Sequence, residues 1–230
     1  MVKKRTLWIF GQSHCLPYSL DDKNSGWDKI LSKKLGCVAK NLAQPGADNL
    51  FIFYSILENI KKINKKDIVV VGWSHPSRKT FILNKTQSKE LKNFSIVYDT
   101  HKHLFYRSKG HPTHSLKDTM HKWFSMKPKQ SGIEYYDTWF RDYFNIDEQK
   151  INFQSYIWSV EKMLDGTVYV PFYFSADSIK GIKNVSKEKC VAEFVRANRV
   201  AISKSNAHMN SEGHKLWAQK IYKEIKHEIE

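Results

Sequence analysis

The sequence predicts a three-layer α/β domain in which helices cover both faces of a central parallel sheet. Three short apolar segments, residues 6–10, 37–42 and 67–72, have the length and composition of strands. Two segments with apolar residues at helical spacing, 27–35 and 49–63, separate them. The first third of the chain therefore alternates strand and helix, which is the order that builds a parallel sheet.

Two features fix the type of these elements. The run Ile68-Val69-Val70-Val71 is continuously β-branched, which is typical of a strand buried on both faces of a parallel sheet. Gly36 stands directly after the first helical segment, where a glycine in the left-handed conformation ends many helices. Both features agree with a sheet that is covered on both sides.

The second half of the chain continues with longer elements. We expect helices at residues 135–144, 148–164 and 211–229, a strand at 168–174, and mostly irregular or helical chain at 175–199. Asn210 or Ser211 is placed to cap the closing helix. These elements complete an α/β order in which the last helix packs on the sheet.

Residues 79–130 interrupt this alternation. The segment is polar, rich in lysine and histidine, and only weakly periodic. We expect an insertion with one or two helices and a long loop, within a single domain spanning residues 1–230. The histidine pairs 101/103 and 111/114 lack an accompanying cysteine or carboxylate, so exposed histidines are favoured over a metal site.

The composition is that of a globular chain without a targeting or membrane segment. Hydrophobic residues make up 41% and aromatic residues 13% of the 230 residues, which excludes a disordered chain. No apolar run approaches the roughly 20 residues of a membrane helix, and the apolar stretch at 7–10 is too short for a signal peptide. We expect a cytoplasmic or virion-associated protein without membrane contact, whose Cys15, Cys37 and Cys190 are free thiols.

The formal net charge of +15 permits two interpretations. A basic field attracts nucleic acid, anionic lipid or acidic glycans. The lysines are spread along the chain, however, and no nucleic-acid-binding motif accompanies them. We favour a solvated basic surface over a nucleic-acid partner, whose binding would depend steeply on salt concentration.

Residues with catalytic side chains follow the first strand and precede the last helix. In a parallel sheet, ligands bind beyond the carboxyl ends of the strands, and Ser13 follows the first strand directly after Gly11 and Gln12. His208 lies in the loop before the closing helix, from which it can reach back to Ser13. The pair predicts a serine nucleophile with a histidine base.

Two further loops at strand ends supply candidate binding groups. Gly46 offers an unhindered backbone N–H, and Ser74 offers a hydroxyl that can donate to an oxyanion. Arg78 offers a cation for an anionic substrate group. Taken singly, these residues are better explained as a turn glycine, a capping serine and a surface arginine; their order along the chain changes that assessment.

The order and spacing of these blocks resemble the SGNH/GDSL hydrolases. Gly11-Gln12-Ser13 is similar to that family's Gly-Asp-Ser block, Pro45-Gly46 to its glycine block, and Gly72-Trp73-Ser74-His75 to its Gly-x-Asn-Asp block. Ser205-Asn206-Ala207-His208, followed by Glu212-Gly213-His214, is similar to its Asp-x-x-His block. The resemblance implies a flavodoxin-like α/β/α sandwich, with Ser13 as nucleophile, His208 as base, and Ser13, Gly46 and Ser74 around the oxyanion.

Three positions depart from the family pattern. Gln12 replaces the aspartate of the first block, Ser74 replaces an asparagine that donates to the oxyanion, and Ser205 replaces the triad aspartate. Ser205 is then the candidate that orients His208, with Asp177 as a substitute carboxylate. The resemblance is to phage-encoded members in particular, and we expect Trp73 and Arg78 to bind substrate.

The resemblance implies a serine hydrolase that cleaves an ester with a Ser-His dyad. The substrate class it implies is an acylated small molecule or an O-acylated glycan, and it implies no metal or organic cofactor. The three departures leave a second hypothesis open, a catalytically degenerate SGNH-like binding or structural protein of a virus particle. The sequence leaves the oligomeric state open.

Overall fold

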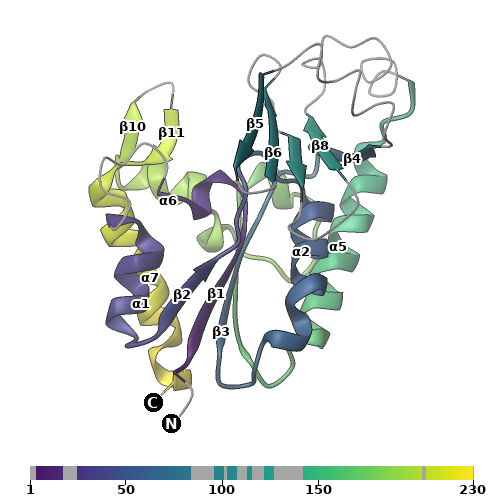
Figure 1. Cartoon of the computed structure of the whole chain (residues 1–230). Coiled ribbons are helices and arrows are strands. Elements are labelled where there is room, and N and C mark those ends of the chain that lie inside the picture. The colour runs from purple at the N-terminus through teal and green to yellow at the C-terminus, as the bar shows by residue number, and fades with distance from the viewer. Residues whose placement is uncertain are drawn as a thin grey trace.

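The fold is built on four parallel strands in the order β2-β1-β3-β9 (Figure 1). These strands are β1 (Thr6–Gly11), β2 (Val38–Asn41), β3 (Ile68–Trp73) and β9 (Val168–Tyr173). The computed structural model describes residues 4–17, 25–83, 96–100, 103–107, 113–115, 122–126, 142–203 and 206–229. Strand β3 is buried at every position, which confirms the prediction made from its β-branched run.

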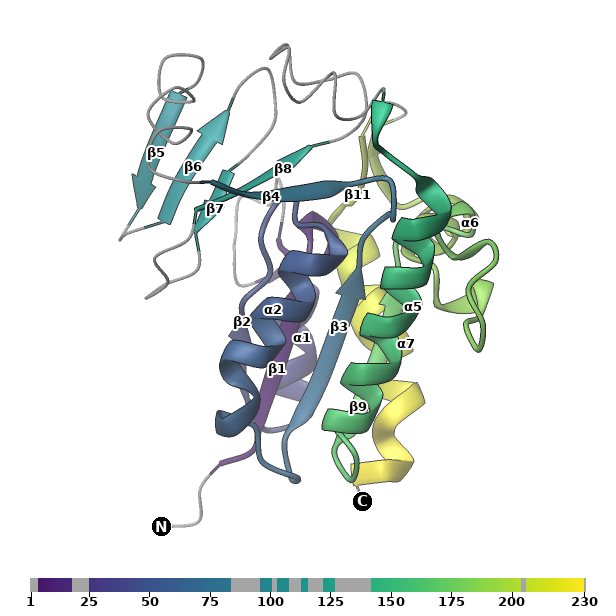
Figure 2. The ribbon, with the colours of Figure 1, turned by 90° about the vertical axis from the view of Figure 1, so that its right-hand side faces the viewer.

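Helices cover both faces of the sheet, giving three layers (Figures 1 and 2). The helices α1 (Trp27–Lys34), α6 (Val191–Ala197) and α7 (Ser211–Ile229) pack on one face, and α2 (Asn49–Asn59) and α5 (Ile146–Met163) on the other. Successive side chains of a strand point to opposite faces. Leu7 and Ile9 of β1 accordingly join the first core, and Trp8 and Phe10 join the second.

Polar side chains cap the first turns of α2 and α7. Asp48 caps α2 by accepting a hydrogen bond from the Phe51 N–H at 2.8 Å. Asn210 caps α7 by accepting from the Gly213 N–H at 2.9 Å, as predicted. Gly36 follows α1 with a φ of 60°, the left-handed conformation expected of it.

Residues 79–130, where we expected one or two helices and a long loop, are strands wherever the structure describes them, and the rest of the segment lies outside the described residues. The strands are β4 (Lys79–Leu83), β5 (Ile96–Thr100), β6 (His103–Arg107), β7 (Thr113–Ser115) and β8 (Lys122–Met126). Strands β5 and β6 form an antiparallel pair, and β4, β8 and β7 form a small antiparallel sheet. Pairing between β4 and β8 is long-range, so local periodicity carries little sign of it. The helix predicted at 135–144 falls mostly outside the described residues.

A second correction concerns the chain before α7, where a loop was expected. Strands β10 (Ala201–Ser203) and β11 (Asn206–Met209) form an antiparallel hairpin there, and His208 lies on β11. Short 3-10 helices connect other elements: η1 (Ser13–Cys15), η3 (Ile60–Lys62), η4 (Asp177–Ile179) and η5 (Lys187–Lys189). A strand holds its side chains in a fixed direction, so His208 has a defined orientation.

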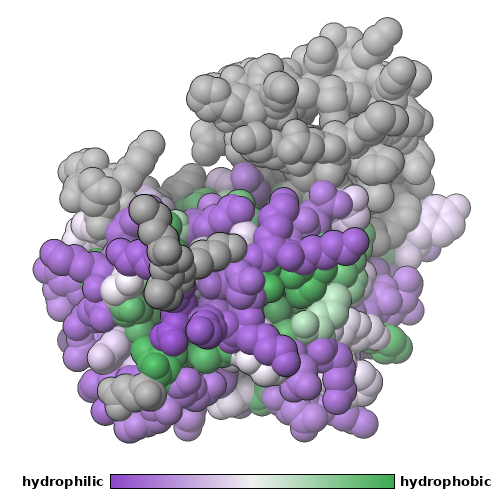
Figure 3. Space-filling view, turned by 60° about the horizontal axis from the view of Figure 1, so that its bottom comes forward, coloured by the Kyte–Doolittle hydropathy of each residue, from purple (hydrophilic) through white to green (hydrophobic). Residues whose placement is uncertain are grey.

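The surface viewed from the end of the molecule where both termini lie is mostly hydrophilic (Figure 3). Apolar side chains occur there in small separate groups. Of the helices that the structure describes, none has the length and apolar character required to cross a membrane.

Asp67, just before β3, ties the beginnings of the two central strands together. Its carboxylate accepts hydrogen bonds from the Thr6 N–H at 2.9 Å, the Trp8 Nε1–H at 3.0 Å and the Asn64 N–H at 3.0 Å. Burial raises the pKa of Asp67, but these donors outweigh burial and hold the pKa below its ordinary value. The ionised form of Asp67 therefore stabilises the folded state.

We predict that Asp67→Asn lowers the free energy of unfolding at pH 7 by about 1–3 kcal/mol, because a charged acceptor of hydrogen bonds from Thr6, Trp8 and Asn64 is lost. The folded pKa lies below the unfolded one, so this contribution is present above the unfolded pKa and disappears as the pH falls through the folded pKa. Urea denaturation at pH 7 and pH 3 should show the gap to wild type closing in acid. The exposed Asp165→Asn serves as control, and an equal effect at both pH values would contradict this account.

Candidate active site

The candidate site lies at the carboxyl edge of the sheet, where β1, β3 and β9 end. The connection from β1 leads to β2 on one side, and β3 lies on the other side of β1. The strand order thus reverses between β1 and β3, which is where open α/β sheets bind ligands. Ser13 follows β1 at this point, within the 3-10 helix η1.

Two glycines let the chain turn sharply after β1. Gly11 and Gly72 lie opposite each other in the β1–β3 register. A Cβ atom added to either glycine would lie 2.3 Å from the Cys15 Sγ. Cys15 is itself fully buried. The turn that carries Ser13 is therefore packed directly onto the ends of the two central strands, which no residue larger than glycine permits.

Ser13 and His208 are brought together from opposite ends of the chain. The Ser13 Oγ lies 2.8 Å from the His208 Nε2, a hydrogen-bonding distance. Both residues are half-buried, so a reactant from solvent can reach them. Such a contact gives a hydroxyl a neighbouring proton acceptor, the first requirement of an activated serine.

The Ser13 hydroxyl has a second neighbour, the Gln12 side chain. The Gln12 Oε1 lies 2.9 Å from the Ser13 Oγ, and the Gln12 Nε2 lies 2.9 Å from the His14 Nδ1. One hydroxyl proton cannot serve both Gln12 and His208. In the orientation of this structure, Ser13 donates to the Gln12 carbonyl, and His208 must then donate to Ser13.

Turning the Gln12 amide end for end reverses these roles. Its NH₂ group then donates to the Ser13 Oγ, and its carbonyl accepts from a protonated His14 Nδ1. That arrangement leaves the Ser13 proton for the His208 Nε2. The orientation of the Gln12 amide and the tautomers of His14 and His208 therefore decide together whether Ser13 is activated.

Aromatic contacts hold the His208 ring. The His14 ring stacks on it with centroids 4.6 Å apart and planes 19° apart, and Phe174 meets the far side of His14 edge-on. The His14 carbonyl accepts a hydrogen bond from the Trp27 Nε1–H at 3.1 Å. The Trp27 backbone N–H in turn donates to the His214 Nδ1 at 3.2 Å. Helices α1 and α7 thus fix the ring against which His208 packs.

Burial favours the neutral form of His208 and His214. It lowers the pKa of His208 below its ordinary value. Burial, reinforced by the nearby His208, lowers the pKa of His214 to about 4. Ser205, the candidate for orienting His208, lies outside the described residues, and the structure records no hydrogen bond between Asp177 and His208. A neutral imidazole is the form that can accept a proton.

The loop after β3 is held by an amide clamp that the sequence did not reveal. The Asn49 Oδ1 accepts from the Ser74 N–H at 2.7 Å, and the Asn49 Nδ2 donates to the Ser74 carbonyl at 3.1 Å. The Ser74 backbone is thereby fixed, while its side chain borders a cavity. Gly46 lies in the neighbouring loop with a φ of 80°, a conformation that favours glycine.

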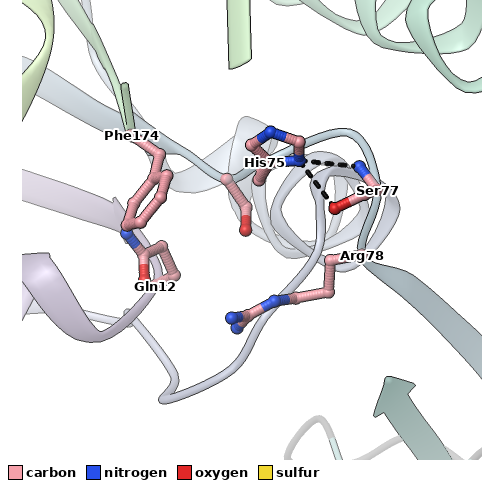
Figure 4. Close-up of a pocket in the computed structure, with 6 residues that line it drawn as sticks. Gln12, His75, Ser77, Arg78 and Phe174 are labelled. Carbon is pink, nitrogen blue, oxygen red and sulfur yellow. Dashed lines mark hydrogen bonds between the residues drawn. The ribbon is translucent and has the colours of Figure 1, made fainter. Parts of the chain in front are cut away.

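A cavity of about 210 Å³ lies beside Gln12, the residue before Ser13 (Figure 4). It is lined by Gln12, Ser74, His75, Ser77, Arg78 and Phe174. Gln12 also contacts the Ser13 Oγ, so cavity and serine share a wall. Figure 4 shows the Arg78 side chain extending from its loop toward Gln12.

The prediction that Trp73 binds substrate was wrong. Its side chain is 0% exposed and belongs to the core between the sheet and helices α2 and α5. The indole packs edge-on against Phe153, and its Nε1–H donates to the Tyr169 hydroxyl at 3.3 Å. Successive residues of β3 point to opposite faces of the sheet, and Trp73 points, with Val69 and Val71, to the face that α2 and α5 cover.

The whole fold is similar to solved structures, one of which is an esterase. It matches the psychrotrophic esterase EstA from Pseudoalteromonas sp. with a TM-score of 0.50 and 11% identity, over 96% of this chain and 97% of that one. It matches TesA with a TM-score of 0.51 and 11% identity, over 96% of this chain and 98% of that one. The chain has the SGNH/GDSL hydrolase fold. No protein-family model and no curated protein sequence matches it.

Seen as an SGNH fold, the site uses several residues that the sequence analysis did not assign. His14, Asn49 and Phe174 position or border the site through a ring stack, a backbone clamp and the cavity wall. His14 stands next to Ser13 in the sequence, which was the one available signal. Asn49 and Phe174 had no such signal, because their roles depend on which loops meet at the edge of the SGNH sheet.

We predict that the pKa of His208 lies below its ordinary value of 6.5, because the charged ring is poorly solvated in this site of the SGNH fold. A ring paired with a carboxylate would not show such a lowered pKa. Histidine side-chain NMR over pH 4–8 measures the value directly. His208→Gln identifies the resonance. A titration above pH 7 would indicate a carboxylate partner and contradict this description of the site.

Proposed function

We propose that the protein is a serine hydrolase of the SGNH type that cleaves an ester with Ser13 and His208. The observation that carries the proposal is the 2.8 Å contact between the Ser13 Oγ and the His208 Nε2 at the strand-order reversal. Serine and histidine supply a nucleophile and a base, so the mechanism calls on no metal or organic cofactor. The similarity to the solved esterase EstA supports the reaction class.

The reaction runs in two stages. The Ser13 Oγ attacks the acyl carbon while its proton passes to the His208 Nε2, with the Gln12 amide turned so that its NH₂ faces Ser13. His208 then protonates the departing alcohol oxygen, which leaves an acyl-enzyme on Ser13. Water, deprotonated by His208, hydrolyses this ester and restores the serine.

An oxyanion forms on the substrate carbonyl in both stages. The donors we assign to it are the Ser13 N–H, the Gly46 N–H and the Ser74 hydroxyl. Asn49 supports this assignment because its hydrogen bonds to the N–H and carbonyl of Ser74 hold that residue in place. Preorganised donors of this kind lower the barrier, each by roughly 3–4 kcal/mol in well-studied cases.

The substrate class we propose is an acylated small molecule or an O-acylated glycan. The cavity beside Ser13 accepts a small group of such a substrate, and Arg78 contributes to its binding. The basic composition of the chain suits an acidic polysaccharide.

We predict that a fluorophosphonate probe modifies Ser13 in the wild-type protein, because such probes react with a serine that a base and oxyanion donors activate. Mass spectrometry of tryptic peptides locates the label. The esterase EstA was solved as a monoethylphosphonate-inhibited structure, which supports the choice of probe.

Three variants control this labelling experiment. Ser13→Ala should abolish labelling and ester hydrolysis, and His208→Ala should reduce both by several orders of magnitude, about 10³ or more. Ser155→Ala, on helix α5, should label as the wild type does. Absence of label at high probe concentration in a folded protein would instead favour the alternative, a non-catalytic SGNH-like binding or virion-associated module.

The lowered pKa of His208 predicts the pH dependence of ester hydrolysis. Only the neutral imidazole accepts the serine proton, so kcat/KM should rise with pH and level off before neutrality. Initial rates with a neutral ester over pH 4–8 test this. A rate that continues to climb tenfold per pH unit above pH 7 would mean that hydroxide, not His208, does the work.

A further inference from the structure

Arg78 is held at a fixed place by the loop between β3 and β4. Its backbone N–H donates to the His75 carbonyl at 3.1 Å, which closes a turn. Within that turn the Ser77 N–H and Oγ lie 3.0 and 2.7 Å from the His75 Nδ1 (Figure 4). The guanidinium therefore extends into the cavity from a turn with its own hydrogen bonds, rather than from a loose surface loop.

The Arg78 side chain is half-buried there, and its Nε–H group lacks an acceptor. The Nε atom is inaccessible to solvent and has no hydrogen-bond partner. Among the described residues, no carboxylate forms an ion pair with the guanidinium. Burial lowers the pKa of Arg78, and the negative charge of Asp48 offsets this lowering only in part. Buried donors almost always have acceptors. The Arg78 Nε–H group therefore calls for an acceptor, which a bound ligand can supply.

The other polar groups of the cavity favour an anion as that ligand. None of the residues that line it is acidic. The His75 Nδ1 faces the Ser77 N–H, which can only donate, so the proton of the neutral ring is on Nε2. Arg78 presents five N–H donors in a planar fork that matches the two oxygens of a carboxylate or phosphate.

The cavity and Ser13 are neighbours, because Gln12 contacts both. Its side chain is 3% exposed, lines the cavity and lies 2.9 Å from the Ser13 Oγ. We propose that this cavity binds a carboxylate or phosphate group of the ester substrate through Arg78, so that the protein is selective for anionic esters. The inference rests on the proposed function and names the substrate class of that same site.

Matched ester pairs test the proposal and locate the charge. The mono-4-nitrophenyl ester of succinic acid and 4-nitrophenyl pentanoate differ by an anionic group on the acyl side. 3-Acetoxybenzoate and 3-acetoxybenzamide differ by an anionic group on the alcohol side. We expect wild type to prefer the anionic member of one pair, as measured by the ratio of the two kcat/KM values.

Arg78→Gln should lower that ratio by between about 10- and 100-fold, since hydrogen bonds to a charged group are lost. Arg78→Lys should recover part of it, because an ammonium keeps the charge but not the fork. The charge-matched control is Lys61→Gln, in the 3-10 helix η3 before β3, which should leave the ratio unchanged. Equal ratios in wild type and Arg78→Gln for both pairs overturn the proposal.

A binding measurement tests the anion site independently of the proposed hydrolysis. Two variants are used so that the test remains possible if one of them does not fold. Calorimetry compares succinate with succinamide on wild type, Arg78→Gln and Arg78→Lys, each checked by its melting curve. Succinate binding that weakens at least about tenfold in either folded variant supports the anion site even if no ester is hydrolysed. Hydrolysis of neutral and anionic esters alike, with no preference for succinate over succinamide in wild type, removes the anion site and keeps the hydrolase.

Discussion

The packing of Cys15 onto Gly11 and Gly72 is the constraint from which the rest of the site follows. Gly11, the last residue of β1, lies beside Gly72, the residue before the last of β3, and the chain turns back over them directly after β1. This turn places Ser13 two residues after the end of β1. His208, Gln12 and the cavity are then all arranged around a backbone that has little freedom to move, because its neighbours are buried strands.

Histidines form a second layer of organisation behind the serine. His14 stacks on His208, and His214 accepts the backbone N–H that begins α1. Both contacts suit uncharged rings, since two stacked imidazolium ions repel and a protonated His214 cannot accept. The same low polarity that keeps His208 available as a base thus also preserves the helix packing around it. Stability and reactivity depend here on one protonation state.

The sequence was sufficient for the sheet and for the central pair of the site, and insufficient for what surrounds them. Strands β1 and β3 are continuous apolar runs, and parallel strands must end at a common edge, so Ser13 was placed correctly. Trp73 was misassigned because local sequence does not tell which buried face a strand residue occupies. The insertion strands and Asn49 were missed because their partners are distant in sequence, and single-chain patterns record local preference only.

The Asn49 clamp has a consequence for how such a site can change over time. The Asn49 amide forms hydrogen bonds to both the N–H and the carbonyl of Ser74. It thereby satisfies the backbone of this one residue as a neighbouring strand satisfies a residue in a β-sheet. The course of the loop therefore does not depend on hydrogen bonds from the side chain at position 74. A small substitution there changes the group that faces the cavity and leaves the hydrogen bonds that fix the backbone in place, which makes the position an accessible one for engineering new selectivity.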